Sequence, residues 1–289
     1  MHTFPLVYLN GEFVPPERAT ISAFDRGFIF GDGVYEVIPV YGRRLFRLAH
    51  HLARLERSLA EIRLRNPLDS AGWQRVFERL VQAVAAEDQS IYVQITRGVA
   101  PRDHAFPADV HPTVFAYAQP ASYPTAEVMA SGVAAVTATD IRWLRCDIKA
   151  TALLANVMLR QQAVERGATE AILIRDGLVT EGAASNVFVV RNGVLHTPPN
   201  GPFILPGITR DLVLELARAH GIPARESPLP ESALHDAEEI WLTSSMREVL
   251  PVTRLNDRPV GNGRPGPWHA RMLALYQDYK QAFREGRVE

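Results

Sequence analysis

The feature that most constrains the fold is the alternation of strand-like and helix-like segments on both sides of a short proline-containing linker. Before the linker, residues 6–14 alternate around the hairpin dipeptide Asn10-Gly11, and apolar residues at helical spacing in residues 48–62 form one stripe. Residues 120–124 separate this part from a second series of strands and helices. A chain of 289 residues also exceeds the size at which one core usually keeps growing. The pattern predicts an α+β fold with mixed sheets and two domains.

Periodicity and turn residues predict individual elements. In the first part we expect strands at residues 34–41, 91–96 and 113–118, and helices at residues 48–62 and 70–84, the second capped by Ser70. In the second part we expect strands at residues 132–138, 171–174, 186–190, 194–196, 240–243 and 252–255, and helices at residues 152–166, 209–220 and 268–283. The predicted division is a smaller N-terminal α/β domain at residues 1–120, a linker at 121–127 and a larger C-terminal domain at 128–289.

Charge and composition indicate a soluble cytoplasmic protein. The formal net charge of -1 gives no basic footprint for nucleic acid or an anionic membrane. No segment has the uninterrupted apolar length of a membrane span, and residues 1–5 do not resemble a signal peptide. Cys146 is the single cysteine, and His50 and His51 are adjacent rather than one helical turn apart. We therefore expect no disulfide within the chain and no metal site.

Lysine is rare in this chain, and that makes Lys149 a candidate catalytic residue. Of the 31 lysines and arginines, only Lys149 and Lys280 are lysines. Lys280 lies in a polar stretch of the last predicted helix, which is typical of a solvated face. A lysine amine can become neutral and attack a carbonyl, which an arginine cannot do. The alternative is that Lys149 is an ordinary surface lysine.

Three further segments carry groups that can bind a phosphate or a ring nitrogen. Residues 205–210 lead directly into a helix, whose free amides and dipole favour phosphate, although Thr209 as an ordinary helix cap explains the pattern equally well. Residues 243–245 follow a buried strand and add hydroxyl groups. Glu181 enters a small-residue segment, where a carboxylate can keep a pyridine nitrogen protonated. An exposed turn glutamate is the alternative for Glu181.

Arginines supply candidates for a carboxylate site. Arg102 and His104 lie two residues apart in a loop rich in glycine and proline, so both can point at one anion. Arg54 lies off the leucine stripe of its helix, which is typical of a surface charge.

An ordered set of segments across nearly the whole chain supports a family resemblance. The segments are Asp25-Arg26-Gly27, residues 30–37, Thr96-Arg97-Gly98 with Pro101-Arg102, residues 140–149, Thr180-Glu181-Gly182 with residues 185–188, and residues 207–211. Together they resemble the class IV, or fold-type IV, aminotransferases, and among them the D-amino-acid branch. The resemblance implies the cofactor pyridoxal 5′-phosphate, held in the larger domain.

The resemblance also implies a role for each candidate residue. Lys149 corresponds to the Schiff-base lysine that moves the substrate proton, and Glu181 to the partner of the pyridine nitrogen. Other positions match cofactor-binding residues, mainly at the phosphate: Arg54, Ile208, Thr209, Ser245 and Ser185. Three residues match the trap for the substrate α-carboxylate: Tyr35, Arg102 and His104. Asp32 and Gly33 belong to the same signature, and we expect them to shape a loop.

In the family the arginine and histidine of the trap come from the partner subunit, so the resemblance implies a homodimer. It further implies ping-pong transfer of an amino group from a D-amino acid such as D-alanine to 2-oxoglutarate or pyruvate. Related activities on the same scaffold are alternatives: a branched-chain L-amino-acid transaminase, an (R)-amine transaminase and an aminodeoxychorismate lyase. A dimeric binding module without catalysis is a further alternative, and it requires Lys149 to be idle.

This chain departs from the family pattern at two places. The serine-rich run after the glutamate is replaced by Ala183-Ala184-Ser185, and Met246-Arg247-Glu248 stands where small hydroxyl residues are commoner. We expect these changes to affect the phosphate contacts or the substrate range.

Overall fold

The computed structural model describes residues 4–109 and 111–288, and the chain divides into two compact units. Unit 1 contains residues up to Ser122, residues Ile148–Leu153 and the chain from Phe283 on, and unit 2 contains Tyr123–Asp147 and Leu154–Ala282. The segment that carries Lys149 therefore groups with the first unit, although unit 2 flanks it in sequence. Residues 1–3, which enter the argument against a signal peptide, lie outside the described residues.

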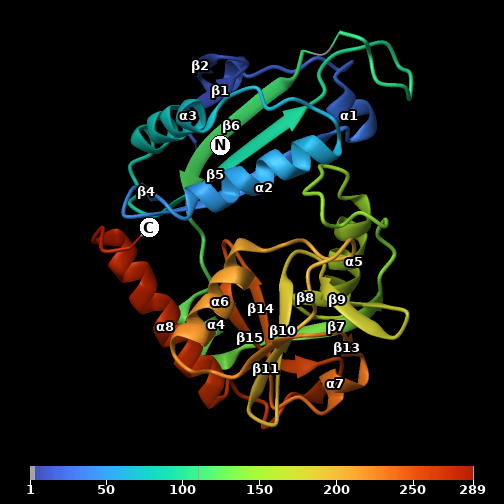
Figure 1. The fold of residues 1–289 in the computed structure, drawn as a ribbon, viewed down its shortest axis with the longest axis vertical. Coiled ribbons are helices and arrows are strands. Elements are labelled where there is room, and N and C mark those ends of the chain that lie inside the picture. Colours follow the sequence, from blue (N-terminus) through green and yellow to red (C-terminus); the bar gives the residue numbers. More distant parts are fainter. Residues whose placement is uncertain (1–3, 110, 289) are drawn as a thin grey trace. The chain divides into compact units, whose positions relative to one another are not determined.

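Unit 1 is built on a six-stranded sheet in which every neighbouring pair is antiparallel (Figure 1). The strand order is β2-β1-β6-β5-β3-β4. The strands are β1 (Val7–Leu9), β2 (Glu12–Val14), β3 (Gly33–Tyr41), β4 (Arg44–Leu45), β5 (Gln89–Thr96) and β6 (Thr113–Pro120). A 3-10 turn (Pro16–Arg18) and helices α1 (Arg26–Phe30), α2 (Leu48–Glu61) and α3 (Ser70–Ala83) complete the unit.

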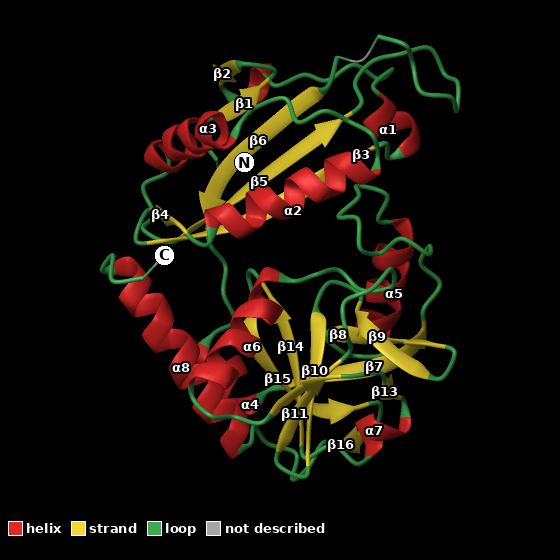
Figure 2. Ribbon diagram, in the orientation of Figure 1, coloured by secondary structure: helices red, strands yellow, loops and turns green. Residues whose placement is uncertain are grey.

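Helices α2 and α3 pack their apolar faces on this sheet (red on yellow in Figure 2). Leu55 and Leu59 of α2 and Trp73 and Phe77 of α3 are almost completely buried against alternate residues of β3, β5 and β6. The first residue of α3 is Ser70, but the cap is Asp69, whose side chain accepts a hydrogen bond from the Gly72 amide at 2.7 Å. The expected Ser70 cap is therefore wrong by one residue.

Unit 2 is built on a ten-stranded mixed sheet with the order β12-β11-β10-β14-β15-β7-β8-β9-β13, and β16 pairs with β15. The pairs β7–β8, β7–β15 and β11–β12 are parallel. Its strands are β7 (Val133–Thr139), β8 (Glu170–Arg175), β9 (Leu178–Gly182), β10 (Asn186–Arg191), β11 (Val194–Thr197), β12 (Ala224–Glu226), β13 (Leu229–Pro230), β14 (Glu239–Ser244), β15 (Glu248–Leu255) and β16 (Arg258–Pro259).

The helices of unit 2 pack on this sheet from several directions: α5 contacts β7 and β8, α6 contacts β14, α4 contacts β15 and α7 contacts β10. They are α4 (Ala126–Ser131), α5 (Leu154–Glu165), α6 (Ile208–Ala219), α7 (Ser232–His235) and α8 (Pro267–Arg284), the last two residues of α8 belonging to unit 1. Two sheets and their helices confirm the expected α+β class. No helix among the described residues is long and apolar enough to cross a membrane.

Two expectations about unit 2 are wrong. The Asp176-Gly177 turn joins β8 to an additional strand, β9, so Glu181 lies buried in a strand rather than in an exposed turn. Lys280 is only 6% exposed, and its Nζ lies 2.7 Å from Glu248 Oε1. The polar sequence around Lys280 suggested a solvated face, because a partner 32 residues away leaves no local signal.

Candidate active site

Lys149 extends the sheet of unit 1 at the free edge of β3. Its carbonyl accepts a hydrogen bond from the Tyr35 amide at 3.0 Å, its amide donates to Ser58 Oγ at 3.3 Å, and Ala150 forms an antiparallel bridge with Val34. Within residues 4–109 and 111–288, no hydrogen bond or ion pair engages Lys149 Nζ; the ammonium lies 4.1 Å from the centroid of the Tyr35 ring. The backbone is fixed while the amine stays available for chemistry.

The alternation of β3 places Tyr35 and Glu36 on opposite faces of the sheet. Tyr35 stacks on Tyr92 at 5.7 Å, on the face away from α2. Glu36 is buried under α2, where its carboxylate accepts Arg54 Nε at 2.7 Å and Arg54 Nη2 at 2.8 Å and meets His51 Nδ1 at 2.8 Å. Burial disfavours the charged form of Glu36, but Arg54 and His51 hold its pKa well below the ordinary range. Arg54, 3% exposed, is therefore a buried, oriented cation and not the surface charge that its helix position suggested.

The loop with Arg102 and His104 is attached to α1. Arg26, which is buried, donates to the carbonyl of Asp103 at 2.5 Å and pairs with Asp32 at 2.8 Å. Arg102 and His104 are exposed and both lie beside the Phe30 ring, at 5.6 Å and 5.4 Å. In the described part of the chain, neither makes a hydrogen bond, ion pair or ring contact with Tyr35, so two members of the expected carboxylate trap share the Phe30 ring and the third does not join them.

Asp32 is the signature residue that we expected to shape a loop. It also accepts Arg97 Nε at 2.8 Å and Nη2 at 3.0 Å. Burial opposes its charge, yet Arg97 and Arg26 lower the pKa of Asp32. Asp32 is therefore a permanent anion that fixes Arg26 and, through it, the loop.

Glu181 is a buried acid of unit 2. Its Oε1 accepts a hydrogen bond from Arg142 Nη1, and its Oε2 accepts from Asn186 Nδ2 at 3.1 Å and from the Leu205 amide at 3.0 Å. Burial raises the pKa of Glu181 to about 7, and Arg142 opposes this only in part. Arg142 also donates twice to Asp140, at 2.9 Å each, so its charge is shared between two carboxylates.

Asn186 connects Glu181 to the start of α6. Its side chain donates both to Glu181 and to the carbonyl of Leu205, the latter at 2.9 Å. Gly207 precedes α6 without a side-chain cap, and a Cβ there would lie 1.9 Å from Asn186 Oδ1. Gly207 thus leaves room for the Asn186 side chain. Because Asn186 holds both Glu181 and the chain that leads into α6, it fixes the first amides of α6, those of Ile208 and Thr209, relative to Glu181. Thr209 does not cap the helix, which leaves these amides for an anion.

Ser185 and the turn with Ser245 share one buried carboxylate. Glu170 is completely buried, and its Oε2 accepts Ser185 Oγ at 3.1 Å and Arg247 Nη1 at 2.5 Å. Arg247 follows Ser245 in the turn between β14 and β15. The two places where the sequence departs from the family pattern are therefore linked through Glu170.

Several of these residues escaped the sequence reasoning as functional groups: Arg142, Asp140, Asn186, Glu170, Glu36 and His51. Arg142, Asp140, Asn186 and Glu36 stand inside segments that carry the family resemblance, which was the available signal. Glu170 had none, because strand β8 reads as an ordinary buried strand. In the described residues, no cluster of three histidine, cysteine or acidic side chains is arranged to hold a metal ion.

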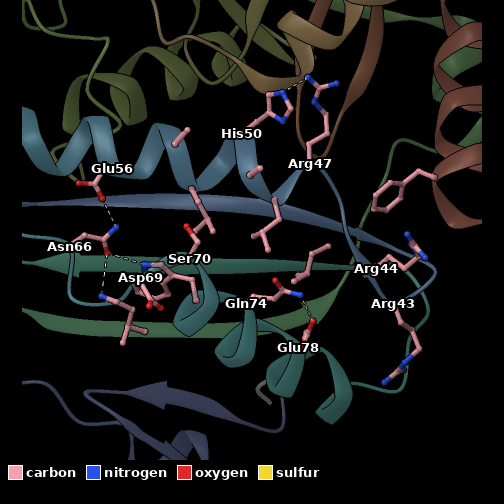
Figure 3. A pocket seen from close by; sticks show the side chains of 18 residues that line it. Arg43, Arg44, Arg47, His50, Glu56, Asn66, Asp69, Ser70, Gln74 and Glu78 are labelled. Atoms are coloured by element: carbon pink, nitrogen blue, oxygen red, sulfur yellow. Dashed lines mark hydrogen bonds between the residues drawn. The ribbon is translucent and has the colours of Figure 1, made fainter. Parts of the chain in front are cut away.

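A groove of about 910 Å³ lies elsewhere in unit 1, between α2 and α3 (Figure 3). Arg43, Arg44, Arg47 and His50 line one end, with Arg47 Nη2 donating to His50 Nε2 at 3.0 Å. None of the candidate residues lines this groove. His50 faces it, whereas the neighbouring His51 is buried against Glu36.

The sequence matches known proteins over most of its length. A family model described as amino-transferase class IV matches residues 33–255. The D-alanine aminotransferase of Bacillus licheniformis is 45% identical over 90% of this chain and 92% of the relative. The enzyme of the same name from Staphylococcus aureus (strain MW2) is 40% identical over 94% of this chain and 97% of the relative.

Solved structures agree in fold. The Escherichia coli branched-chain amino acid aminotransferase superposes with a TM-score of 0.89 at 28% identity, covering 93% of this chain and 92% of that one. A T.th. branched-chain amino acid aminotransferase with pyridoxamine 5′-phosphate gives a TM-score of 0.90 at 26% identity, covering 96% and 94%. The family match and the identity over nearly the whole chain place this protein among the class IV aminotransferases.

Proposed function

We propose that this aminotransferase moves the amino group of D-amino acids, such as D-alanine, to a 2-oxo acid, 2-oxoglutarate or pyruvate. The observation that carries the choice of substrate is the 40–45% identity to D-alanine aminotransferases over at least 90% of the chain. The branched-chain enzymes, which share the fold, are 25–28% identical. We place the enzyme in the cytoplasm.

Each unit, taken by itself, carries groups suited to the cofactor of the family, pyridoxal 5′-phosphate. Lys149 has an available amine for its aldehyde, and Glu181 has a buried carboxylate that gains a second charge partner, beside Arg142, when it faces a protonated pyridine nitrogen. The uncapped start of α6 at Ile208 and Thr209 suits its phosphate. Ser185, Ser245 and Arg54 complete the proposed set. Thr243, two residues before Ser245, has a buried hydroxyl without a partner among the described residues, which also fits an anion nearby.

The proposed division of labour follows from these positions. In the proposal, residues 1–120 form the smaller domain, residues 121–127 the linker and residues 128–289 the larger cofactor-binding domain, except that Ile148–Leu153 and the chain from Phe283 on group with the first unit. The bound ring delocalises the electron pair left when the substrate Cα loses its proton. Glu181 keeps the proton on the ring nitrogen, because the buried carboxylate is stabilised by an adjacent positive charge. Lys149 Nζ takes the proton from the Cα of the amino donor and would deliver it to C4′ of the cofactor, and in the second half-reaction it would move a proton in the reverse direction, onto the Cα of the product.

Tyr35, Arg102 and His104 are the proposed site for the substrate α-carboxylate. Within the described residues, Arg102 and His104 make no hydrogen bond, ion pair or ring contact with Tyr35 and lie beside Phe30 instead, which supports their delivery to the site of a second copy. An exposed apolar stripe on α5 supports a homodimer: Leu154, Val157 and Met158 expose 74%, 60% and 55% of their surface. A lone soluble chain rarely leaves such a stripe uncovered.

Incubation with D-alanine and 2-oxoglutarate, followed by pyruvate detection, tests the proposal. We expect pyruvate from D-alanine and none from L-alanine, with the parallel reciprocal plots of a ping-pong reaction. L-leucine, an (R)-amine and aminodeoxychorismate serve as competing substrates. A preference for L-leucine would replace the proposal with a branched-chain activity, and pyruvate from aminodeoxychorismate without an acceptor would replace it with a lyase.

A further inference from the structure

The residue that follows the turn between β14 and β15 has a backbone conformation that its side chain does not favour. Ser244 pairs with Glu248 across the hairpin, so Ser245, Met246 and Arg247 form a three-residue turn. Glu248, the first residue of β15, follows this turn directly and has a φ of 55°, in the left-handed region that glycine and asparagine favour. A residue with this side chain keeps a left-handed backbone only where its surroundings hold it.

Helix α8 supplies those surroundings. Glu248 is 6% exposed, and its Oε1 accepts Lys280 Nζ at 2.7 Å while its Oε2 accepts Gln277 Nε2 at 2.5 Å. Lys280 Nζ also lies 4.3 Å from the centroid of the Tyr123 ring. Side chains from two adjacent turns of α8 thus hold the carboxylate of Glu248 in place.

The other end of the turn is held independently. Arg247 reaches the buried Glu170, which also accepts the hydroxyl of Ser185. The turn with Ser245 is therefore fixed by one ion pair on each side, both within unit 2. In an arginine-rich chain, the compact ammonium of lysine gives three donors in a small volume, where the guanidinium fork needs more space.

We propose that Lys280, acting through Glu248, is a positioning residue that holds the β14–β15 turn so that Ser245 meets the cofactor phosphate. The inference rests on the proposed function, because it assumes that Ser245 contacts this phosphate. It assigns Lys280 an indirect task in cofactor binding, and Arg247 the matching task on the opposite side of the turn.

The test compares two ligands of the cofactor-free enzyme by calorimetry: pyridoxamine 5′-phosphate and pyridoxamine, which lacks the phosphate. We expect Lys280→Met to weaken binding of the phosphate ester by about 10-fold to 100-fold, the worth of a hydrogen bond to a charged group, and to leave pyridoxamine affinity unchanged. Arg271→Met, which removes an exposed cation of the same helix, is the matched control and should change neither affinity.

A second variant separates positioning from general destabilisation. Glycine adopts the left-handed conformation without help. The double variant Lys280→Met with Glu248→Gly should therefore regain most of the affinity for pyridoxamine 5′-phosphate. Unchanged affinity in Lys280→Met, an equal loss for both ligands, or no recovery in the double variant would each overturn the proposal. Failure of the unaltered enzyme to bind pyridoxamine 5′-phosphate would instead overturn the proposed function.

Discussion

The two lysines of the chain have similar aromatic neighbours and opposite polar surroundings. Lys149 Nζ lies 4.1 Å from the Tyr35 ring and Lys280 Nζ lies 4.3 Å from the Tyr123 ring. Lys280 is paired with a buried carboxylate, whereas the ammonium of Lys149 has no ion pair within the described residues. At Lys149 the backbone is hydrogen-bonded and the amine is available; at Lys280 the amine itself is held.

The difference teaches that burial and rarity do not identify a reactive lysine. Both lysines are rare, and the more deeply buried one is paired for structure. A lysine that attacks a carbonyl must be able to lose its proton, and a carboxylate partner opposes that loss. Availability of the amine, at a position fixed by its backbone, is the feature that separates Lys149 from Lys280.

The largest expected difference between the two lysines is in catalysis. Lys149→Ala should lower the rate of transamination by roughly 1000-fold or more, because a positioned general base and its covalent link are both lost. The measurement is pyruvate release from D-alanine. Lys280→Arg, which keeps a cation on α8, is the comparison and should retain far more activity. A Lys149→Ala enzyme as fast as the original would exclude the assigned role.

Stability should show the reverse order. Lys280→Met leaves Glu248 as a buried, uncompensated charge, so the free energy of unfolding should fall by roughly 3–5 kcal/mol. Lys149→Met breaks no ion pair and should change it by less than about 1 kcal/mol. Urea unfolding of both variants without cofactor provides the values. Equal losses would show that the ion pair at Lys280 adds nothing.

The carboxylates sharpen the comparison through pH. Glu248 has its own cation, whereas Glu181 shares Arg142 with Asp140, and burial raises the pKa of Glu181 to about 7 from an ordinary value of 4.5. The folded state therefore binds a proton more tightly than the unfolded state. This contribution to stability is fully present below pH 4.5 and is lost as the pH rises through 7, by on the order of 3 kcal/mol.

Glu181→Gln replaces the titrating carboxyl group with a neutral amide, so the stability of the cofactor-free protein should depend less on pH between about 5 and 8. Urea unfolding at both pH values measures the change. If Glu181→Gln kept the full pH dependence of the unaltered protein, another group would have to be responsible.

Sequence patterns predicted what depends on local periodicity. The stripe of α2, the hairpin turns and the strands of the first sheet follow from residues a few positions apart, and the structure has them close to the expected places. The Ser70 cap, the missing strand β9 and the solvated Lys280 were wrong, because cap geometry, strand pairing and ion pairing depend on three-dimensional neighbours. Arg54 likewise looked like a surface charge, because its partner Glu36 lies 18 residues earlier, on strand β3 under the helix.

Within the candidate site, the resemblance located the residues proposed to touch the reaction more readily than the residues that support them. Lys149 and Glu181 stand in recognisable segments. Arg142 stands in the same segment as Lys149. Its task depends on two carboxylates, those of Asp140 and Glu181, and Glu181 is 39 residues away in the chain. Glu170 and Arg247 are 77 residues apart in the chain and have no shared local pattern.

The contact between Asn186 and Gly207 has a consequence for which molecules the site accepts. One amide side chain fixes both the carboxylate proposed for the ring nitrogen and the chain leading to the helix start proposed for the phosphate. The separation between these two points is therefore a fixed length within unit 2. A ligand is measured against that length at both ends at once, so a ring whose anionic arm is one atom longer or shorter has to give up one of its two contacts.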